Sequence, residues 1–230
     1  MALAHIKRKI HNFLHPKRGE VWMLHRVVNQ RSTNPEQRWL ELTPDWLEQR
    51  ILDRQHQGYR FIPIDEVPQG SHFVNITIDD GYIDTFSVAL PLFQRLKIPF
   101  TVYITTGFLD NTMPMTWCPN QALGLRSEQL KILAEEPLCT IGCHTCSHPH
   151  LSTLPEEQQR REMADCKADL EHLLGTEIQH LAYPHGDYNT DTLRIVAELG
   201  FKTAVTTNGR PVRTDARLLE LDRITLTQPN

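Results

Sequence analysis

Short apolar runs of β type alternate with longer helical patterns along most of the chain. Strands that are separated by helices pair in parallel, because each right-handed crossover returns the chain to the same end of the sheet. This alternation therefore predicts an α/β fold. The runs expected to be strands cover residues 21–25, 60–64, 73–78, 100–105, 139–144, 180–183, 202–206 and 223–226.

Helical patterns fill the gaps between these runs, and their ends carry the usual signals. Thr43 and Pro44 are typical of a helix start, while Gly175 and Gly200 are typical of helix ends. The expected helices begin at residues 43 and 127 and cover 84–96, 154–174 and 191–199.

Two architectures fit this order of elements, a (β/α) barrel and an open doubly wound sheet. No glycine-rich phosphate loop follows any expected strand, which disfavours the nucleotide-binding form of the open sheet. Polar residues gather where strands end, and a barrel presents its active site there. The sequence therefore favours a barrel. Without a repeat or linker, residues 1–230 are predicted to form one domain with a basic N-terminal extension, residues 1–18.

The composition argues against several classes of function. A net charge of −4 gives no reason to expect nucleic acid as a partner. No apolar stretch approaches the roughly 20 residues of a spanning helix, and the basic start lacks the apolar run of a secretory signal. Five irregularly spaced cysteines fit a reducing compartment. We expect a cytoplasmic protein without a transmembrane segment, whose residues 7–18 form a solvated helix rather than one lying on a membrane.

Two adjacent carboxylates, Asp79 and Asp80, close the apolar run 73–78, and Gly81 follows them. Both can be buried only if something offsets their charge, and a divalent cation does so. Gly81 allows a sharp turn after the pair. The alternative is a helix cap, which explains one aspartate but not two.

A second group of polar residues follows the run 139–144. His144 and His148 would lie on one face of a helical turn and could then share a metal ion with a carboxylate. Such a set leaves coordination positions open, as catalytic sites require. A rival interpretation is a structural zinc knot, which would leave the aspartate pair unexplained. Its ligands would be Cys143, Cys146, His148 and His150.

A third group, residues 181–188, ends a short strand with Pro184 and Gly186. Proline and glycine together indicate a rigid turn whose backbone N–H groups can face outward. Outward N–H groups are the donors that an oxyanion needs. Many strand ends have this pattern, so it is weak by itself.

Taken in order, the three segments resemble the polysaccharide deacetylases, carbohydrate esterase family 4, which includes the rhizobial nodulation-factor deacetylase. The Asp-Asp-Gly motif is matched by residues 79–81, and the His-Ser/Thr-x-x-His-Pro motif by residues 144–149. The resemblance extends over residues 21–226, including the start at Met23–Val27. It implies a distorted (β/α) barrel with an incomplete ring of about seven parallel strands.

The resemblance also implies roles. Asp79 resembles the general base, while Asp80, His144 and His148 resemble the ligands of one divalent cation. Zinc is the first expectation for that cation, with iron, cobalt or nickel as alternatives. The backbone N–H of His185 would hold the tetrahedral oxyanion. Contacts with the substrate are expected from Trp117, Tyr183, Pro184 and Arg223.

The chain departs from the family pattern at two places. Ala182 stands where many members have an arginine that orients the base, and residues 219–224 lack a late histidine that serves as the acid. His25 is our candidate acid. The alternative is a buried histidine with a purely structural role, whose ring nitrogens are hydrogen-bonded inside the protein. His185 and His150 are weaker candidates. Arg223 would orient a carboxylate or the substrate, or form a plain surface ion pair.

The leading hypothesis is therefore a metal-dependent hydrolase that removes acetyl groups, N-acetyl first, from an acetylated sugar or oligosaccharide. The same scaffold could hydrolyse a non-sugar amide, because the motifs describe the reacting carbon and not the rest of the substrate. A catalytically silent module that retains metal and binds glycan is the third hypothesis.

Overall fold

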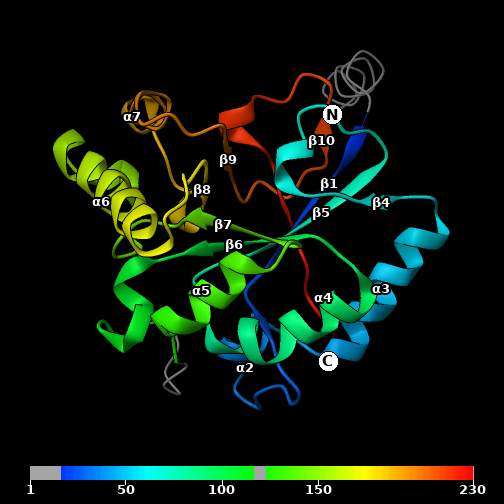
Figure 1. Ribbon diagram of the computed structural model, residues 1–230. Coiled ribbons are helices and arrows are strands. Elements are labelled where there is room, and N and C mark those ends of the chain that lie inside the picture. The colour runs from blue at the N-terminus through cyan, green and yellow to red at the C-terminus, as the bar shows by residue number, and fades with distance from the viewer. Residues whose placement is uncertain (1–16, 117–122, 230) are drawn as a thin grey trace.

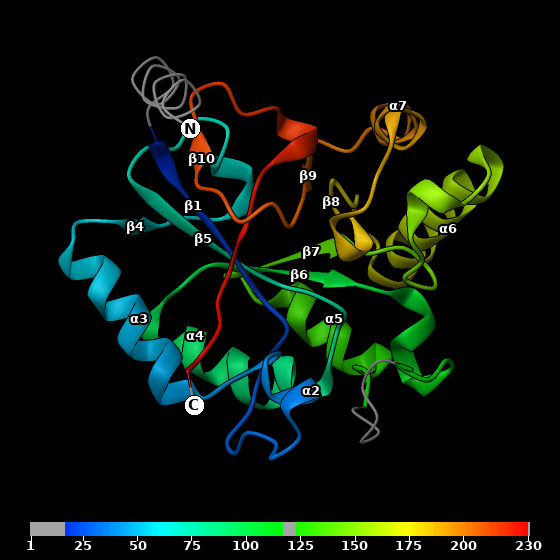
Figure 2. The ribbon, with the colours of Figure 1, turned by 180° about the vertical axis from the view of Figure 1, so that it is seen from behind.

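The computed structural model describes residues 17–116 and 123–229. A curled, mostly parallel sheet forms a half-barrel, with helices around it (Figure 1). The N-terminal end of the described chain lies beside β10, and the C-terminal end lies near α3 at the opposite side of the molecule, as both ribbon views show (Figure 2).

Seven strands form the continuous path β10-β1-β5-β6-β7-β8-β9. All neighbours along it are parallel except β1 and β10, which are antiparallel. The short strands β4 and β11 add to β5 and β1, and β2 pairs with β3 in a separate ribbon. The bounds are β1 Lys17–Leu24, β2 Arg26–Val27, β3 Glu41–Leu42, β4 Arg60–Phe61, β5 Phe73–Ile78, β6 Phe100–Ile104, β7 Cys139–Cys143, β8 His180–Ala182, β9 Thr203–Val205, β10 Val212–Arg213 and β11 Ile224–Thr225.

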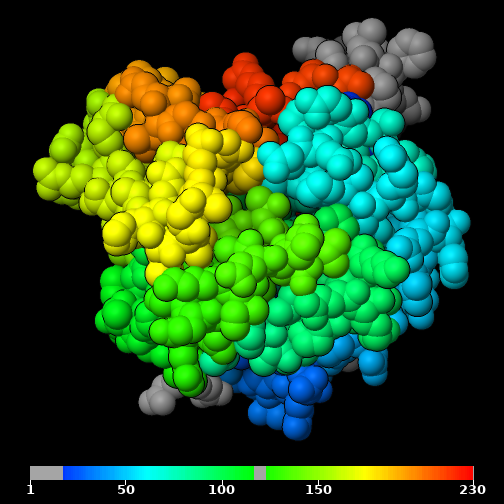
Figure 3. Space-filling view, in the orientation of Figure 1, coloured from blue at the N-terminus to red at the C-terminus, as the bar shows by residue number. Residues whose placement is uncertain are grey.

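The helices cover the outer side of the curled sheet and pack on its apolar side chains (Figure 1). Figure 3 shows one face on which green segments from the middle of the chain lie below the yellow and orange segments, with the cyan segments beside these at the upper right. All six residues of β5 are buried, as expected for a central strand of a covered parallel sheet. The α-helices are α2 Pro35–Arg38, α3 Pro44–His56, α4 Leu90–Leu96, α5 Ser127–Glu135, α6 Glu156–Leu174 and α7 Thr190–Glu198.

The distorted (β/α) half-barrel confirms the predicted fold class, and most element positions agree with the sequence signals. Pro44 is the first residue of α3, and Gly175 ends α6 with φ +68°. The expected helix over 84–96 differs, because residues 85–89 form a π-helical turn before α4. Strand β1 begins earlier than expected, and its first residues pair with β10. Across the described residues, no helix combines the length and apolar character needed to cross a membrane.

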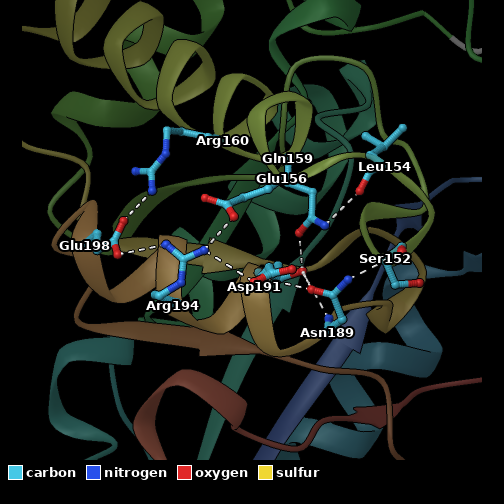
Figure 4. A network of polar contacts seen from close by, with 10 residues as sticks. Ser152, Leu154, Glu156, Gln159, Arg160, Asn189, Asp191, Arg194 and Glu198 are labelled. Atoms are coloured by element: carbon cyan, nitrogen blue, oxygen red, sulfur yellow. Dashed lines mark hydrogen bonds and ion pairs between the residues drawn. The ribbon is translucent and has the colours of Figure 1, made fainter.

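A polar network fastens α6 to α7 and to the loop at residues 152–154 (Figure 4). Arg194 of α7 forms ion pairs with Glu156 at 2.8 Å and with Glu198 at 3.1 Å. The Asn189 side chain caps α7 and also donates to the carbonyl oxygen of Ser152. The network therefore joins the segment that follows His150 to the segment that follows the turn at residues 184–186.

Candidate active site

The parallel register brings the polar motifs to one edge of the sheet. Leu24 of β1 pairs with Ile78 of β5, so His25 and Asp79 follow neighbouring strand ends. In the same way, Cys143 of β7 pairs with Leu181 of β8, which places His144 near the turn after β8. The carboxyl ends of parallel strands are where a barrel carries its active site.

Asp79 is held by Arg223 in a buried two-point ion pair. The Nη1 and Nη2 atoms of Arg223 lie 2.7 Å from the two carboxylate oxygens of Asp79. Arg223 has no exposed surface, and its Nε donates to the carbonyl oxygen of Thr206 at 2.9 Å. Nη1 also donates to Thr77 Oγ1 at 3.0 Å. The guanidinium is thus fully engaged inside the protein, which excludes a surface ion pair and leaves no room for direct contact with substrate.

Asp80, His144 and His148 each direct one possible metal-ligand atom to the same place. These three atoms all lie within 4.8 Å of one another. Asp80 Oδ1 lies 3.4 Å from His144 Nε2 and 3.5 Å from His148 Nε2. This oxygen is buried and accepts no hydrogen bond from the described residues. A buried carboxylate oxygen without a donor is costly unless a cation neutralises it.

The tautomer of His144 points to the same conclusion. Its Nδ1 lies 2.8 Å from the carbonyl oxygen of Ala182, and because a carbonyl only accepts, Nδ1 carries the proton. In the neutral ring, Nε2 then presents a lone pair toward Asp80 Oδ1. Two acceptors face each other there, and a metal ion would satisfy both. The residues therefore fit a divalent cation, with the backbone carbonyl orienting the ligand from behind.

The two histidines converge through a loop and not through the helical turn expected from their spacing. Thr145 and His148 both have left-handed backbones, with φ +68° and +60°. Thr145 Oγ1 accepts a hydrogen bond from the His148 N–H at 3.0 Å and fixes this loop. Asp80 and His185 also have positive φ, +75° and +59°. Of the eight described non-glycine residues with positive φ, these four belong to the three motifs, and strained backbones of this kind are common at functional sites.

Burial and charge work against each other at this edge. Burial opposes ionisation of Asp79, but the Arg223 charge prevails and lowers the pKa of Asp79. Burial likewise opposes the charged form of His144, yet its carboxylate neighbours, Asp80 first, raise its pKa. Burial, with the charge of His144, lowers the pKa of His148 to about 3. Separated pKa values of this kind are typical of functional sites.

His25 lies on the same edge, directly after β1. Burial lowers its pKa, although the charges of Asp80 and Asp79 act in the opposite direction. Its ring packs against Trp39, with 5.6 Å between the ring centroids. The structure therefore brings His25 to the carboxylates, where the sequence placed the candidate acid.

The turn after β8 presents its backbone to the site. Pro184 and Tyr183 are both buried, and the Tyr183 hydroxyl donates to the carbonyl oxygen of Leu219 at 2.8 Å. The substrate contacts expected of these two side chains would therefore have to come from the backbone. His185 has φ +59°, and its N–H donates no hydrogen bond to the described residues. The His185 ring stacks on His150 with centroids 3.9 Å apart and meets His148 at 4.4 Å.

The match to a family model decides what kind of site this is. The model for polysaccharide deacetylase matches residues 66–204, more than half of the chain, and includes Asp79, Asp80, His144 and His148. The chain belongs to the polysaccharide deacetylase family.

Individual proteins show a likeness to this chain as well. YxkH of Bacillus subtilis (strain 168), described as a polysaccharide deacetylase, is 28% identical over 151 residues, 66% of this chain. The alignment spans about half of that protein, 50% of its length. The Streptococcus pyogenes deacetylase PplD, solved in complex with acetate, is 28% identical with a TM-score of 0.78, covering 92% of this chain and 93% of PplD. IcaB from Ammonifex degensii has the same fold, with 23% identity, a TM-score of 0.76 and 92% of each chain covered.

The zinc-knot interpretation is wrong for this deacetylase fold. Cys143 is buried at the end of β7, with its Sγ atom 3.9 Å from the carbonyl oxygen of Met163 in α6. His148 instead faces Asp80. Trp117, an expected substrate contact, lies outside the described residues. One residue near the site, Trp39, was missed altogether, because nothing in the local sequence distinguishes an exposed tryptophan from a buried one.

Proposed function

We propose that this protein is a metal-dependent deacetylase that removes the acetyl group from an N-acetylated sugar unit of a polysaccharide or oligosaccharide. The observation that carries the proposal is the buried Asp80 oxygen facing the Nε2 atoms of His144 and His148. Membership of the polysaccharide deacetylase family supports the same chemistry. Acetate, the product of such a reaction, is bound in the structure of PplD.

Asp80, His144 and His148 would hold one divalent cation, with zinc as the first candidate. When bound, such a cation supplies a Lewis acid that polarises the acetyl carbonyl and lowers the pKa of a water molecule. The other groups at the site belong to the chain itself, and each has a role that follows from its position.

Asp79 is proposed as the general base. Both of its oxygens are held by Arg223, so the carboxylate keeps one orientation and stays ionised near neutral pH. A carboxylate in this state accepts a proton from the attacking water molecule. Arg223 thereby takes over the orienting role that an arginine at position 182 has in many members of the family.

His25 is proposed as the acid that protonates the leaving nitrogen. Burial lowers its pKa, and the charges of Asp80 and Asp79 act in the opposite direction and favour the protonated ring that this role requires. In the strand order β1-β5-β6-β7, His25 follows β1, Asp79 follows β5 and His144 follows β7. His25 and His144 therefore lie on opposite sides of Asp79. The N–H of His185 is proposed to donate to the oxyanion, because it faces no acceptor among the described residues. The three polar roles of base, acid and oxyanion donor would thus come from the ends of β5, β1 and β8.

Acetate release from a panel of N- and O-acetylated sugars and oligosaccharides tests the proposal. The protein is stripped of metal with a chelator and reloaded with zinc or cobalt before the assay. Acetate should appear only after reloading, and Asp79→Asn should slow its release by about 10²–10⁴-fold. Asp165→Asn, which alters an exposed carboxylate on α6, serves as the control and should keep full activity.

Two other outcomes would change the proposal. Metal-dependent hydrolysis of simple amides without any turnover of sugars would favour the non-sugar amide. Glycan binding without acetate release from any substrate would favour a silent binding module.

A further inference from the structure

Trp39 is the most exposed aromatic side chain in the described part of the chain, with 51% of its surface accessible. Its ring meets His25 edge-on, with the centroids 5.6 Å apart and the planes at 65°. An exposed indole beside a candidate catalytic residue has an apolar face that water covers poorly, and such faces are common at binding sites.

The backbone fixes the position of Trp39 relative to His25. Trp39 ends the short helix α2 and stands just before β3. Strands β2 and β3 pair in register, and the Arg26 N–H donates to the carbonyl oxygen of Leu40 at 3.1 Å. Residues 25–26 and 39–40 are therefore tied together. The indole is held in place by its backbone while its outer face stays open.

Two of the other aromatic rings near the site are closed to a ligand. Tyr82 and Tyr183 have no exposed surface. Tyr188 is half-buried and stacks on Tyr183, with centroids 4.7 Å apart. Among the described tryptophan, tyrosine and phenylalanine residues, Trp39 combines a ring contact with His25 and an exposed face.

We propose that Trp39 stacks on the pyranose ring of the sugar that carries the acetamide group. This inference rests on the proposed function and on His25 as the acid. The acid must reach the nitrogen that leaves, so the sugar carbon bonded to that nitrogen lies one bond beyond it. Since Trp39 packs on His25, the ring carrying this carbon passes over the indole. The axial C–H groups of a pyranose are weakly positive and suit the negative face of an indole.

Trp39 is thus a substrate-positioning residue and performs no proton transfer. Losing a stacking partner weakens ground-state and transition-state binding alike, which raises KM and leaves kcat unchanged. We expect Trp39→Ala to raise KM for an N-acetylglucosamine oligosaccharide about ten-fold. Trp39→Phe, which retains a smaller ring, should restore part of this loss.

The matched control is Ile132→Ala on α5, because Ile132 is also 51% exposed. It removes a comparable exposed apolar surface on another element and should leave KM unchanged. Binding is measured in parallel on the Asp79→Asn background, by calorimetry with the N-acetylglucosamine tetramer. There Trp39→Ala should weaken affinity about ten-fold as well.

The outcomes separate this inference from the proposed function. Acetate release by the wild type with an unchanged KM in Trp39→Ala overturns the stacking role alone. A fall in kcat without a change in KM also overturns it, because Trp39 would then act by positioning His25. Binding that depends on Trp39 without acetate release sinks the catalytic proposal and supports the stacking role. Absence of binding to every acetylated sugar overturns both.

Discussion

Arg223 and Asp79 are 144 positions apart in the chain, yet their side chains are both buried and form a two-point ion pair. Arg223 immediately precedes β11. Strand β11 pairs with β1, and β1 is the neighbour of β5. A long-range strand pairing therefore positions the partner of the proposed base. The arginine that holds Asp79 thus stands just before β11, whereas position 182 is an alanine.

Removing this arginine should damage stability and activity together. We expect Arg223→Met to lower the free energy of unfolding by about 3–5 kcal/mol, because Asp79 would be left as a buried charge without a partner. Arg223→Lys should retain part of the stability but lose the fork that holds both oxygens. Urea denaturation and kcat/KM measure the two effects.

Arg217→Met is the control for loss of an arginine, since the Arg217 side chain is 80% exposed and pairs with Glu220 on the surface. Surface ion pairs contribute about 0–1 kcal/mol, so this variant should resemble the wild type. Equal effects of the two substitutions would contradict the role given to the buried pair.

Metal content should separate the two adjacent aspartates. We expect Asp79→Asn to retain one equivalent of cobalt, with turnover reduced by about 10²–10⁴-fold, because the ligand set is intact and the base is lost. Asp80→Asn should fail to retain the metal, because the buried Oδ1 atom of Asp80 lies 3.4 Å and 3.5 Å from the Nε2 atoms of the two histidines. Metal analysis after gel filtration and the cobalt absorption spectrum measure this difference. Retention of metal by Asp80→Asn would exclude the proposed ligand set.

Gly186 should be required for the turn that carries His185. A Cβ atom at residue 186 would lie 2.1 Å from Thr207 Oγ1, and the backbone there has φ +68°. Gly186→Ala should therefore displace the turn and reduce kcat. Gly209 has nearly the same conformation, φ +69°, but a Cβ atom there would meet nothing within 4 Å, so Gly209→Ala should cost only about 1 kcal/mol and keep kcat. Similar kcat values for both variants would show that the turn has no catalytic importance.

His180 should make the fold sensitive to acid. Its side chain is buried between Thr203 and Asp65, and burial lowers its pKa below 6.5 despite the nearby Asp65 charge. The unfolded chain takes up this proton below pH 6.5 while the folded chain resists it. Stability should therefore fall as the pH drops from 6.5 toward the folded pKa.

Urea unfolding at pH 7.5 and pH 5.5 measures this effect. We expect a smaller loss between the two pH values in His180→Asn than in the wild type. His56→Asn, which removes an exposed imidazole from α3, is the control. An unchanged loss in His180→Asn would assign the acid sensitivity to other groups.

The sequence was informative wherever a local pattern determines the result. Alternating runs predicted the strands, and Pro44 and Gly175 marked real helix ends. Asp79, His144 and His25 were expected near one another because each follows the carboxyl end of a strand. The parallel sheet does align these strand ends.

Non-local relationships were harder to predict. The spacing of His144 and His148 indicated a helical turn, whereas Thr145 and His148 adopt left-handed conformations that no propensity favours. Arg223 had three open roles in the sequence, and only strand pairing distinguished among them. Burial also could not be predicted for aromatic side chains, since Tyr82 and Tyr183 are inaccessible and Trp39 is open.

The distance in sequence between Asp79 and Arg223 has a consequence for biosynthesis. Chains are made from the N-terminus, so Asp79, Asp80, His144 and His148 all leave the ribosome before Arg223 does. Until β11 joins the edge of β1, the Asp79 carboxylate has no guanidinium beside it and is expected to stay hydrated or protonated. A nascent chain could thus hold every candidate metal ligand and still lack a competent base. Activity would begin only when the last strand is added to the sheet.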